Sequence, residues 1–141
     1  SSKAIASALI SNGIKEVGIT NRTRSKSQII SENLGAKVSV VDWRNAPEMV
    51  GEVDIIINAT SMGMVGQPDF SQPISRAKKT ALVVDIVYNP LVTDLLKEAK
   101  KLNLKTVGGI GMLINQAVPG FEHWFQSTPV IDEDIRKFII E

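Results

Sequence analysis

The sequence predicts an α/β fold in which a doubly wound parallel sheet carries helices on both faces. Short apolar runs with the character of buried strands alternate along the chain with segments of helical periodicity. The run at 53–58 is apolar on both faces, which is typical of a strand at the centre of a parallel sheet. The chain has 141 residues, of which 43% are hydrophobic, and this size suits one globular domain over residues 1–141.

The first half of the chain alternates helix and strand patterns. We expect five strands in all, at 15–20, 37–41, 53–58, 81–87 and 104–107. A helical pattern at 1–10 precedes the first strand. Between the first two strands, Ser25 or Ser27 is expected to cap a helix that ends at Gly35.

The second half begins with a segment at 64–80 that is rich in glycine and proline and is predicted to be a long loop. Residues 91–102 have the pattern of an amphipathic helix that covers the sheet. A glycine-rich turn at 108–111 leads into an apolar helix, and Pro119 predicts a bend or break in it. Asp132 is expected to cap a final short helix.

A basic loop follows the first strand. It holds Arg22, Arg24 and Lys26, three cations within five positions, and no carboxylate. In dinucleotide-binding folds, an acidic residue in such a strand-end loop binds the ribose of NAD, whereas basic residues accommodate the 2′-phosphate of NADP. A guanidinium can bind a phosphate through two hydrogen bonds, and a lysine adds a point charge. The loop therefore predicts NADP as the cofactor, and a solvated basic turn is the alternative interpretation.

The helical pattern at the start of the chain has no strand before it. A dinucleotide-binding fold needs a strand and a glycine-rich turn at that point, because the pyrophosphate lies at the amino terminus of the first helix. We therefore expect a Rossmann-like fold that is truncated at its amino-terminal strand and glycine-rich turn. Ser1 and Ser2 represent at most the end of that turn.

Two hydroxyl side chains, Thr60 and Ser61, follow the central strand. Hydroxyls at this place can contact a phosphate or the nicotinamide ribose. They also commonly begin a turn by bonding to their own backbone, and for this pair alone the turn is the preferred interpretation.

Composition excludes several classes of function. The net charge of +1 gives no reason to expect nucleic acid or an anionic membrane as a partner. The absence of cysteine excludes disulfides and thiolate chemistry, and we expect no metal site. The apolar runs are too short to span a bilayer and no signal-peptide pattern is present, so we expect a cytoplasmic protein. The oligomeric state stays open.

Four motifs together resemble the carboxy-terminal, NADP-binding half of shikimate dehydrogenases. They are NRTRSK at 21–26, NATSMG at 58–63, DIVYNPLVT at 85–93 and GGIGMLINQA at 108–117, in the order and spacing of that family. The last two are specific, because they are not general features of dinucleotide-binding folds. The resemblance implies NADP-dependent, reversible reduction of 3-dehydroshikimate to shikimate in aromatic amino acid biosynthesis. A quinate/shikimate dehydrogenase of broader specificity and a non-catalytic dinucleotide-binding module are the alternatives.

The resemblance also implies roles for individual residues. The cofactor-binding residues would be Ser1, Asn21, Arg22, Thr23, Arg24, Lys26, Thr60, Ser61, Ile86, Gly109 and Met112. Among them, the basic loop would surround the adenosine 2′-phosphate, whereas the last three would border the nicotinamide. Lys26 stands where the family often has arginine, which keeps the charge but loses the planar fork.

Tyr88 and Gln116 would reach the substrate, shikimate or 3-dehydroshikimate, through hydrogen bonds of the phenol and the amide. For Tyr88 the alternative is a half-buried tyrosine at a strand end.

No catalytic residue is expected in this chain. The family's catalytic lysine and aspartate belong to an amino-terminal substrate domain, which the sequence does not contain. Lys3, Lys15 and Asp85 lie in no motif that would let them take over that role, and His123 is interpreted as structural or surface-exposed. We therefore expect the 141-residue chain alone to be inactive as a dehydrogenase.

Overall fold

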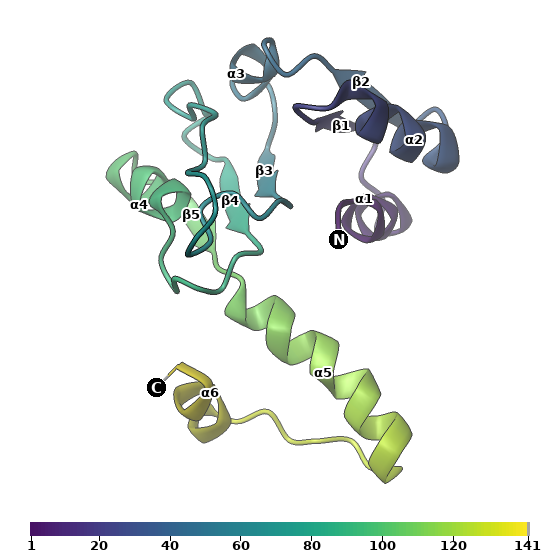
Figure 1. Ribbon diagram of the computed structural model, residues 1–141, viewed down its shortest axis with the longest axis vertical. Coiled ribbons are helices and arrows are strands. Elements are labelled where there is room, and N and C mark those ends of the chain that lie inside the picture. Colours follow the sequence, from purple (N-terminus) through teal and green to yellow (C-terminus); the bar gives the residue numbers. More distant parts are fainter. Residues whose placement is uncertain (141) are drawn as a thin grey trace.

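The computed structural model describes residues 1–140 as an α/β fold of short parallel strands and flanking helices (Figure 1). The strands are β1 (Val17–Thr20), β2 (Val38–Val41), β3 (Ile55–Asn58), β4 (Leu82–Asp85) and β5 (Lys105–Val107). The helices are α1 (Ser2–Ser11), α2 (Arg24–Leu34), α3 (Ala46–Met49), α4 (Asp94–Lys101), α5 (Ile110–Phe125) and α6 (Glu133–Ile140). All five predicted strands are confirmed, each within its expected range. The segment at 59–81 contains no helix or strand, as predicted for 64–80.

The strands form two separate parallel sheets. β1 pairs with β2, and β3, β4 and β5 pair in that order, so the predicted parallel pairing is confirmed. β1 and β3 are not hydrogen-bonded to each other, and a cavity lined by Ile19 and Ile57 among others lies between them. The chain winds outward from this gap in both directions. In doubly wound sheets such a reversal of strand order is the place where ligands bind.

The best-packed core lies around β4 and α4. Its buried side chains pack into one cluster, composed of Val50, Ile74, Val83, Leu95, Ala99 and Leu104. α4 is the expected amphipathic cover helix, and the Thr93 hydroxyl caps it by accepting a hydrogen bond from the Leu96 amide. β4 is therefore held by the apolar packing of Val83 against α4, and the amino terminus of α4 is fixed by its Thr93 cap.

α2 begins earlier than the sequence predicts. Its N-cap is Thr23, and the expected caps Ser25 and Ser27 both lie inside the helix. The cause is Asn21, whose side-chain oxygen accepts a hydrogen bond from the Thr23 amide at 2.9 Å and turns the chain into the helix. The predicted end at Gly35 is confirmed, with a left-handed φ of 81°.

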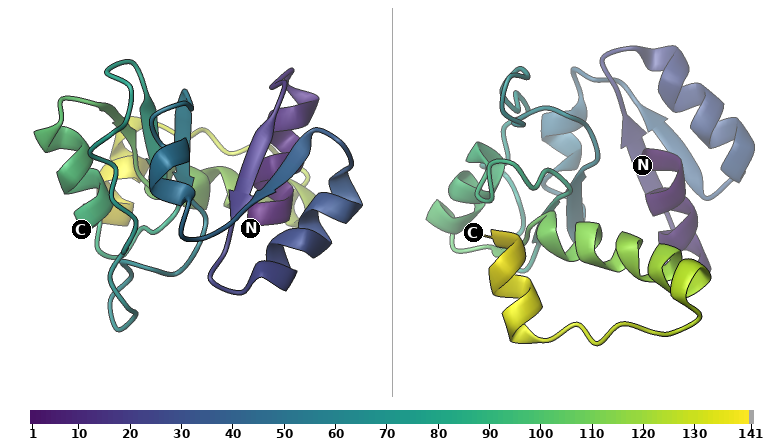
Figure 2. Two further views of the ribbon diagram at one scale, coloured as in Figure 1. Left: turned by 90° about the horizontal axis from the view of Figure 1, so that it is seen from above. Right: turned by 60° about the horizontal axis from the view of Figure 1, so that its bottom comes forward.

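Of the bend or break predicted at Pro119, the break is wrong, because α5 runs unbroken from Ile110 to Phe125. Proline removes the hydrogen bond to the carbonyl four residues earlier, which belongs to Asn115. Asn115 is exposed, and water can therefore satisfy that carbonyl. Figure 2 shows α5 as a long helix, followed by an extended segment that leads to α6. Asp132 caps α6 as predicted, accepting a hydrogen bond from the Ile135 amide at 2.9 Å.

Candidate functional site

A polar pocket of about 150 Å³ lies at the carboxyl ends of β1 and β3. It brings together six of the predicted cofactor residues, from two loops that are far apart in sequence. The lining residues are Asn21, Arg22, Thr23, Lys26, Trp43, Thr60, Ser61 and Met62. Parallel strands place the loops that follow them at one sheet edge, which is why the basic loop and the hydroxyl loop meet here.

The two cations that line this pocket are free to bind an anion. Arg22 and Lys26 are exposed, and neither forms an ion pair within residues 1–140. Arg24 differs, because its guanidinium lies 3.5 Å from the carboxylate of Asp42 and it does not line the pocket. The pocket can therefore offer one guanidinium and one ammonium group to a phosphate.

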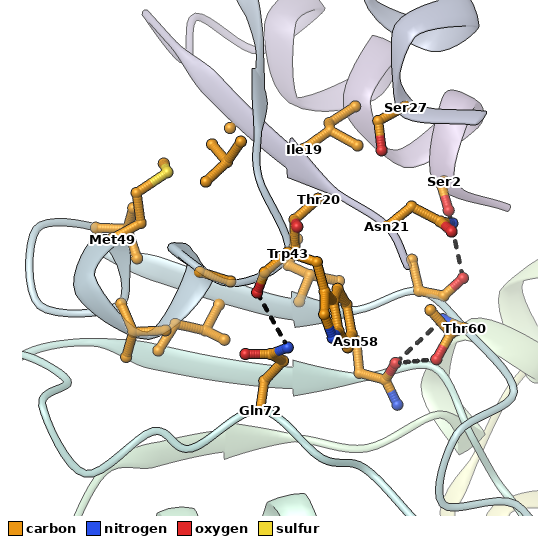
Figure 3. A pocket seen from close by; sticks show the side chains of 18 of the residues that line it. Ser2, Ile19, Thr20, Asn21, Ser27, Trp43, Met49, Asn58, Thr60 and Gln72 are labelled. Carbon is orange, nitrogen blue, oxygen red and sulfur yellow. Dashed lines mark hydrogen bonds between the residues drawn. The ribbon is translucent and has the colours of Figure 1, made fainter. Parts of the chain in front are cut away.

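A second cavity, of about 210 Å³, fills the gap between β1 and β3 (Figure 3). Most of the residues that line it are apolar, among them Ile5 of α1, Ile19 of β1 and Ile57 of β3. It shares Asn21, Trp43 and Thr60 with the polar pocket. The hydroxyls of Thr20 and Ser27 line it and are buried without a hydrogen-bond partner within residues 1–140. On the other side, the Ser2 hydroxyl donates to the Ala59 carbonyl at 3.3 Å. Ser1 precedes this residue as the N-cap of α1 and is exposed.

The loop after β3 is held by a buried side chain that sequence reasoning did not single out. Asn58 is 2% exposed, and its oxygen accepts hydrogen bonds from the amide and the hydroxyl of Thr60 at 3.1 and 2.7 Å. Its amide nitrogen donates to the Met62 carbonyl and to the carboxylate of Asp85. The Thr60 hydroxyl in turn accepts from the Met62 amide at 3.0 Å. The turn that the sequence analysis preferred for this pair is thus present at Thr60, which also lines the pocket.

Asp85 is a fully buried carboxylate at the end of β4. It accepts hydrogen bonds from Asn58 at 3.0 Å, from the Val87 amide at 3.0 Å and from the Thr93 hydroxyl at 2.7 Å. Burial raises the pKa of this carboxyl, and the hydrogen bonds from Thr93, Val87 and Asn58 oppose that shift.

The residues predicted to border the nicotinamide lie after β4 and β5. A Cβ atom on the buried Gly109 would collide with the carbonyl oxygen of Ile86 and would lie 2.6 Å from that of Val87. Only glycine therefore allows the turn before α5 to approach this segment. Met112 and Gln116 follow on α5, the first half-buried and the second exposed.

Tyr88 is 40% exposed, so it is more open than the half-buried alternative suggested. The predicted nicotinamide and substrate residues line neither of the two cavities described above.

Two other pocket residues were missed, Trp43 and Met62. Trp43 lies shortly after β2, and Asn21 lies directly after β1. Because the ends of parallel strands meet at one sheet edge, the position of Trp43 after a predicted strand could have indicated its place in the pocket.

Residues 1–140 contain no group of three or more histidine, aspartate or glutamate side chains that could hold a metal ion. Across the same residues, no helix is long and apolar enough to cross a membrane.

Comparisons with known proteins agree on one family. A model described as shikimate / quinate 5-dehydrogenase matches residues 1–111. A curated shikimate dehydrogenase (NADP(+)) from Jannaschia sp. (strain CCS1) is 47% identical over 98% of this chain and 50% of its own length. The chain thus spans about half the length of the curated relatives it matches.

Two solved structures are also similar. Quinate dehydrogenase from Corynebacterium glutamicum in complex with NAD has a TM-score of 0.89 at 29% identity, covering 98% of this chain and 50% of its own. Shikimate 5-dehydrogenase from Thermus thermophilus, in complex with NADP(H) and shikimate, has a TM-score of 0.73 at 29% identity, covering 87% and 44%.

Proposed function

The chain belongs to the shikimate / quinate 5-dehydrogenase family, and we propose that it is the NADP-binding part of a shikimate dehydrogenase. The protein that carries it would reduce 3-dehydroshikimate reversibly to shikimate, with the nicotinamide supplying or accepting the hydride. The observation that carries this proposal is the polar pocket that Arg22 and Lys26 line together with Thr60 and Ser61. The order of the shikimate dehydrogenase motifs along the chain supports it.

The adenosine 2′-phosphate would bind between Arg22 and Lys26. Within residues 1–140, Asp42 is the carboxylate that forms an ion pair with this loop, through Arg24. Its side chain also accepts a hydrogen bond from the Arg44 amide at 2.9 Å. Within residues 1–140, no carboxylate lines the polar pocket, which favours NADP over NAD. Thr23 and Asn21 shape the loop through their own hydrogen bond, and Ser1 would lie near the pyrophosphate at the amino terminus of α1.

The nicotinamide would lie beyond Thr60, against the segment formed by Ile86 and Gly109 and the start of α5 with Met112. Tyr88 and Gln116 would donate or accept hydrogen bonds at the carboxylate or hydroxyls of the substrate. We assign no proton transfer to Asp85, because it is fully buried and its oxygens accept hydrogen bonds within the protein. The resemblance to shikimate dehydrogenases gives that role to no other residue of this chain. The isolated chain is accordingly proposed to be inactive.

A steady-state assay of the protein as its gene encodes it tests this function, with shikimate and quinate as substrates and with NADP and NAD. We expect the highest kcat/KM with shikimate and NADP. Equal or better efficiency with NAD would overturn the cofactor assignment, and preference for quinate would favour a quinate/shikimate dehydrogenase. NADPH binding without turnover of either substrate would favour a non-catalytic dinucleotide-binding module.

A further inference from the structure

We propose that Asp85 is a positioning residue, which holds the cofactor-facing loop 59–63 and the substrate-side segment 86–88 in one fixed arrangement. This inference rests on the proposed function, because it concerns how that reaction's two binding regions are aligned. Asp85 touches neither cavity, and it acts only through the three groups that donate hydrogen bonds to it.

The first connection reaches the cofactor side. Asp85 pairs in register with Asn58 across β3 and β4, and its Oδ1 accepts from the Asn58 amide at 3.0 Å. That bond fixes which way the Asn58 amide faces, so the Asn58 oxygen points at the backbone amide and hydroxyl of Thr60. Thr60 lines both cavities. The orientation of a pocket residue is thus set by a carboxylate that lies outside the pocket.

The second connection reaches the substrate side. The same Oδ1 accepts from the Val87 amide at 3.0 Å, directly after the end of β4. This bond sets the path of the segment whose carbonyl oxygens pack against Gly109, and Tyr88 is its next residue. A single carboxylate oxygen therefore joins the two strand-end loops.

The third connection anchors the carboxylate itself. Oδ2 accepts from the Thr93 hydroxyl at 2.7 Å, and Thr93 is the N-cap of α4. The Thr93 oxygen accepts from the Leu96 amide, so its one proton is free to bond to Asp85. All three partners of Asp85 act as donors, which is the pattern that an ionised, acceptor-only carboxylate requires.

The test uses variants of the protein as its gene encodes it. NADPH affinity is measured by fluorescence titration, and the KM for shikimate by steady-state assay. Asp85→Ala removes the connections to the cofactor side and to the substrate side together. We therefore expect the Kd for NADPH and the KM for shikimate each to rise by about tenfold to a hundredfold, as for misplaced binding groups. Asp85→Asn keeps an oxygen for Asn58 and Val87, so both constants should stay near wild type. Asn58→Ala removes only the cofactor connection, so NADPH affinity should fall while the KM for shikimate is unchanged.

Leu95→Ala is the matched control for a purely structural effect, because Leu95 is buried in the same region and takes no part in these hydrogen bonds. If Leu95→Ala, at a similar loss of thermal stability, changes both constants as Asp85→Ala does, the proposal is overturned. Wild-type constants in Asp85→Ala overturn it as well. Should Asp85→Ala fail to fold, Asn58→Ala decides: weakened NADPH binding at unchanged KM supports the proposal, and unchanged binding overturns it. A wild-type protein that neither binds NADPH nor oxidises shikimate would instead refute the proposed function.

Discussion

The two sheets of this molecule differ in how many side chains they bury and in whether the buried polar groups are hydrogen-bonded. At the β3–β4–α4 side, Asn58, Asp85 and Thr93 are buried and bonded to one another, beside the main apolar cluster. Across α1, β1, α2 and β2, the buried residues are only Ala6, Ser27 and Val38. The hydroxyls of Thr20 and Ser27 there have no partner within residues 1–140.

This difference indicates that one sheet mainly stabilises the fold and the other mainly forms the candidate cofactor site. The β3–β4–β5 sheet with α4 contains the packing and the satisfied polar network that stabilise the fold. The β1–β2 sheet and α2 carry Arg22 and Lys26, the two cations that line the candidate cofactor site and that form no ion pair within residues 1–140. Mutations on the two sides should therefore affect different measurements, and variants of similar chemistry can be compared across them.

The largest expected effect is on stability, at Leu95. Leu95→Ala should lower the free energy of unfolding by about 2–5 kcal/mol, because Leu95 is 1% exposed within the core cluster. Ile30→Ala, on the β1 side, should cost less, because Ile30 is only half-buried and already borders a cavity. Urea denaturation followed by circular dichroism measures both. Equal losses would contradict the proposed difference between the two sides.

The next effect is on cofactor affinity, at Arg22. Arg22→Ala should cost about 1.5–3 kcal/mol of NADP binding, roughly tenfold to a hundredfold, because a charge-assisted phosphate contact is lost. The KM for shikimate should stay nearly unchanged. Arg24→Ala is the matched control, since Arg24 pairs with Asp42 and does not line the pocket. A similar loss of affinity in both variants, or an equal loss for both substrates, would argue against a specific phosphate site.

Features set by local sequence patterns were largely predictable, whereas individual hydrogen bonds between distant residues were not. Strand positions were predictable, because short apolar runs such as Ile55–Ile57 stand out between polar and glycine-rich segments. The meeting of the basic loop with Thr60 was predictable too, because parallel strand ends share one edge. The Asn58–Asp85 pair was not, since it depends on the register of two strands whose paired residues are 27 positions apart. The start of α2 was missed because a local hydrogen bond, donated by the Thr23 amide to the Asn21 side-chain oxygen, turns the chain into the helix before the two serines.

A smaller effect is expected at Gly109, where the turn before α5 packs against the segment that follows β4. Gly109→Ala should destabilise the protein by about 1–3 kcal/mol, because the new methyl group would collide with the Ile86 and Val87 carbonyls. Gly111→Ala is the control, because a Cβ atom there would have no neighbour within 4 Å and alanine favours the helix. Thermal unfolding distinguishes them. A Gly109→Ala variant as stable as wild type would mean that this close approach is easily relaxed.

The smallest effect compares two buried hydroxyls with opposite surroundings. Thr93→Ala removes a helix cap and one partner of Asp85, and should cost about 0.5–2 kcal/mol of stability. Ser27→Ala removes a hydroxyl that is buried without a partner, and alanine has the higher helix propensity. The free energy of unfolding should therefore stay unchanged or rise by up to about 1 kcal/mol, because an unsatisfied polar group no longer has to be desolvated. Both are measured by urea denaturation under identical conditions. If Ser27→Ala destabilises the protein as much as Thr93→Ala, the Ser27 hydroxyl has a hydrogen-bond partner in solution, and the contrast between the two sides is weaker than the structure indicates.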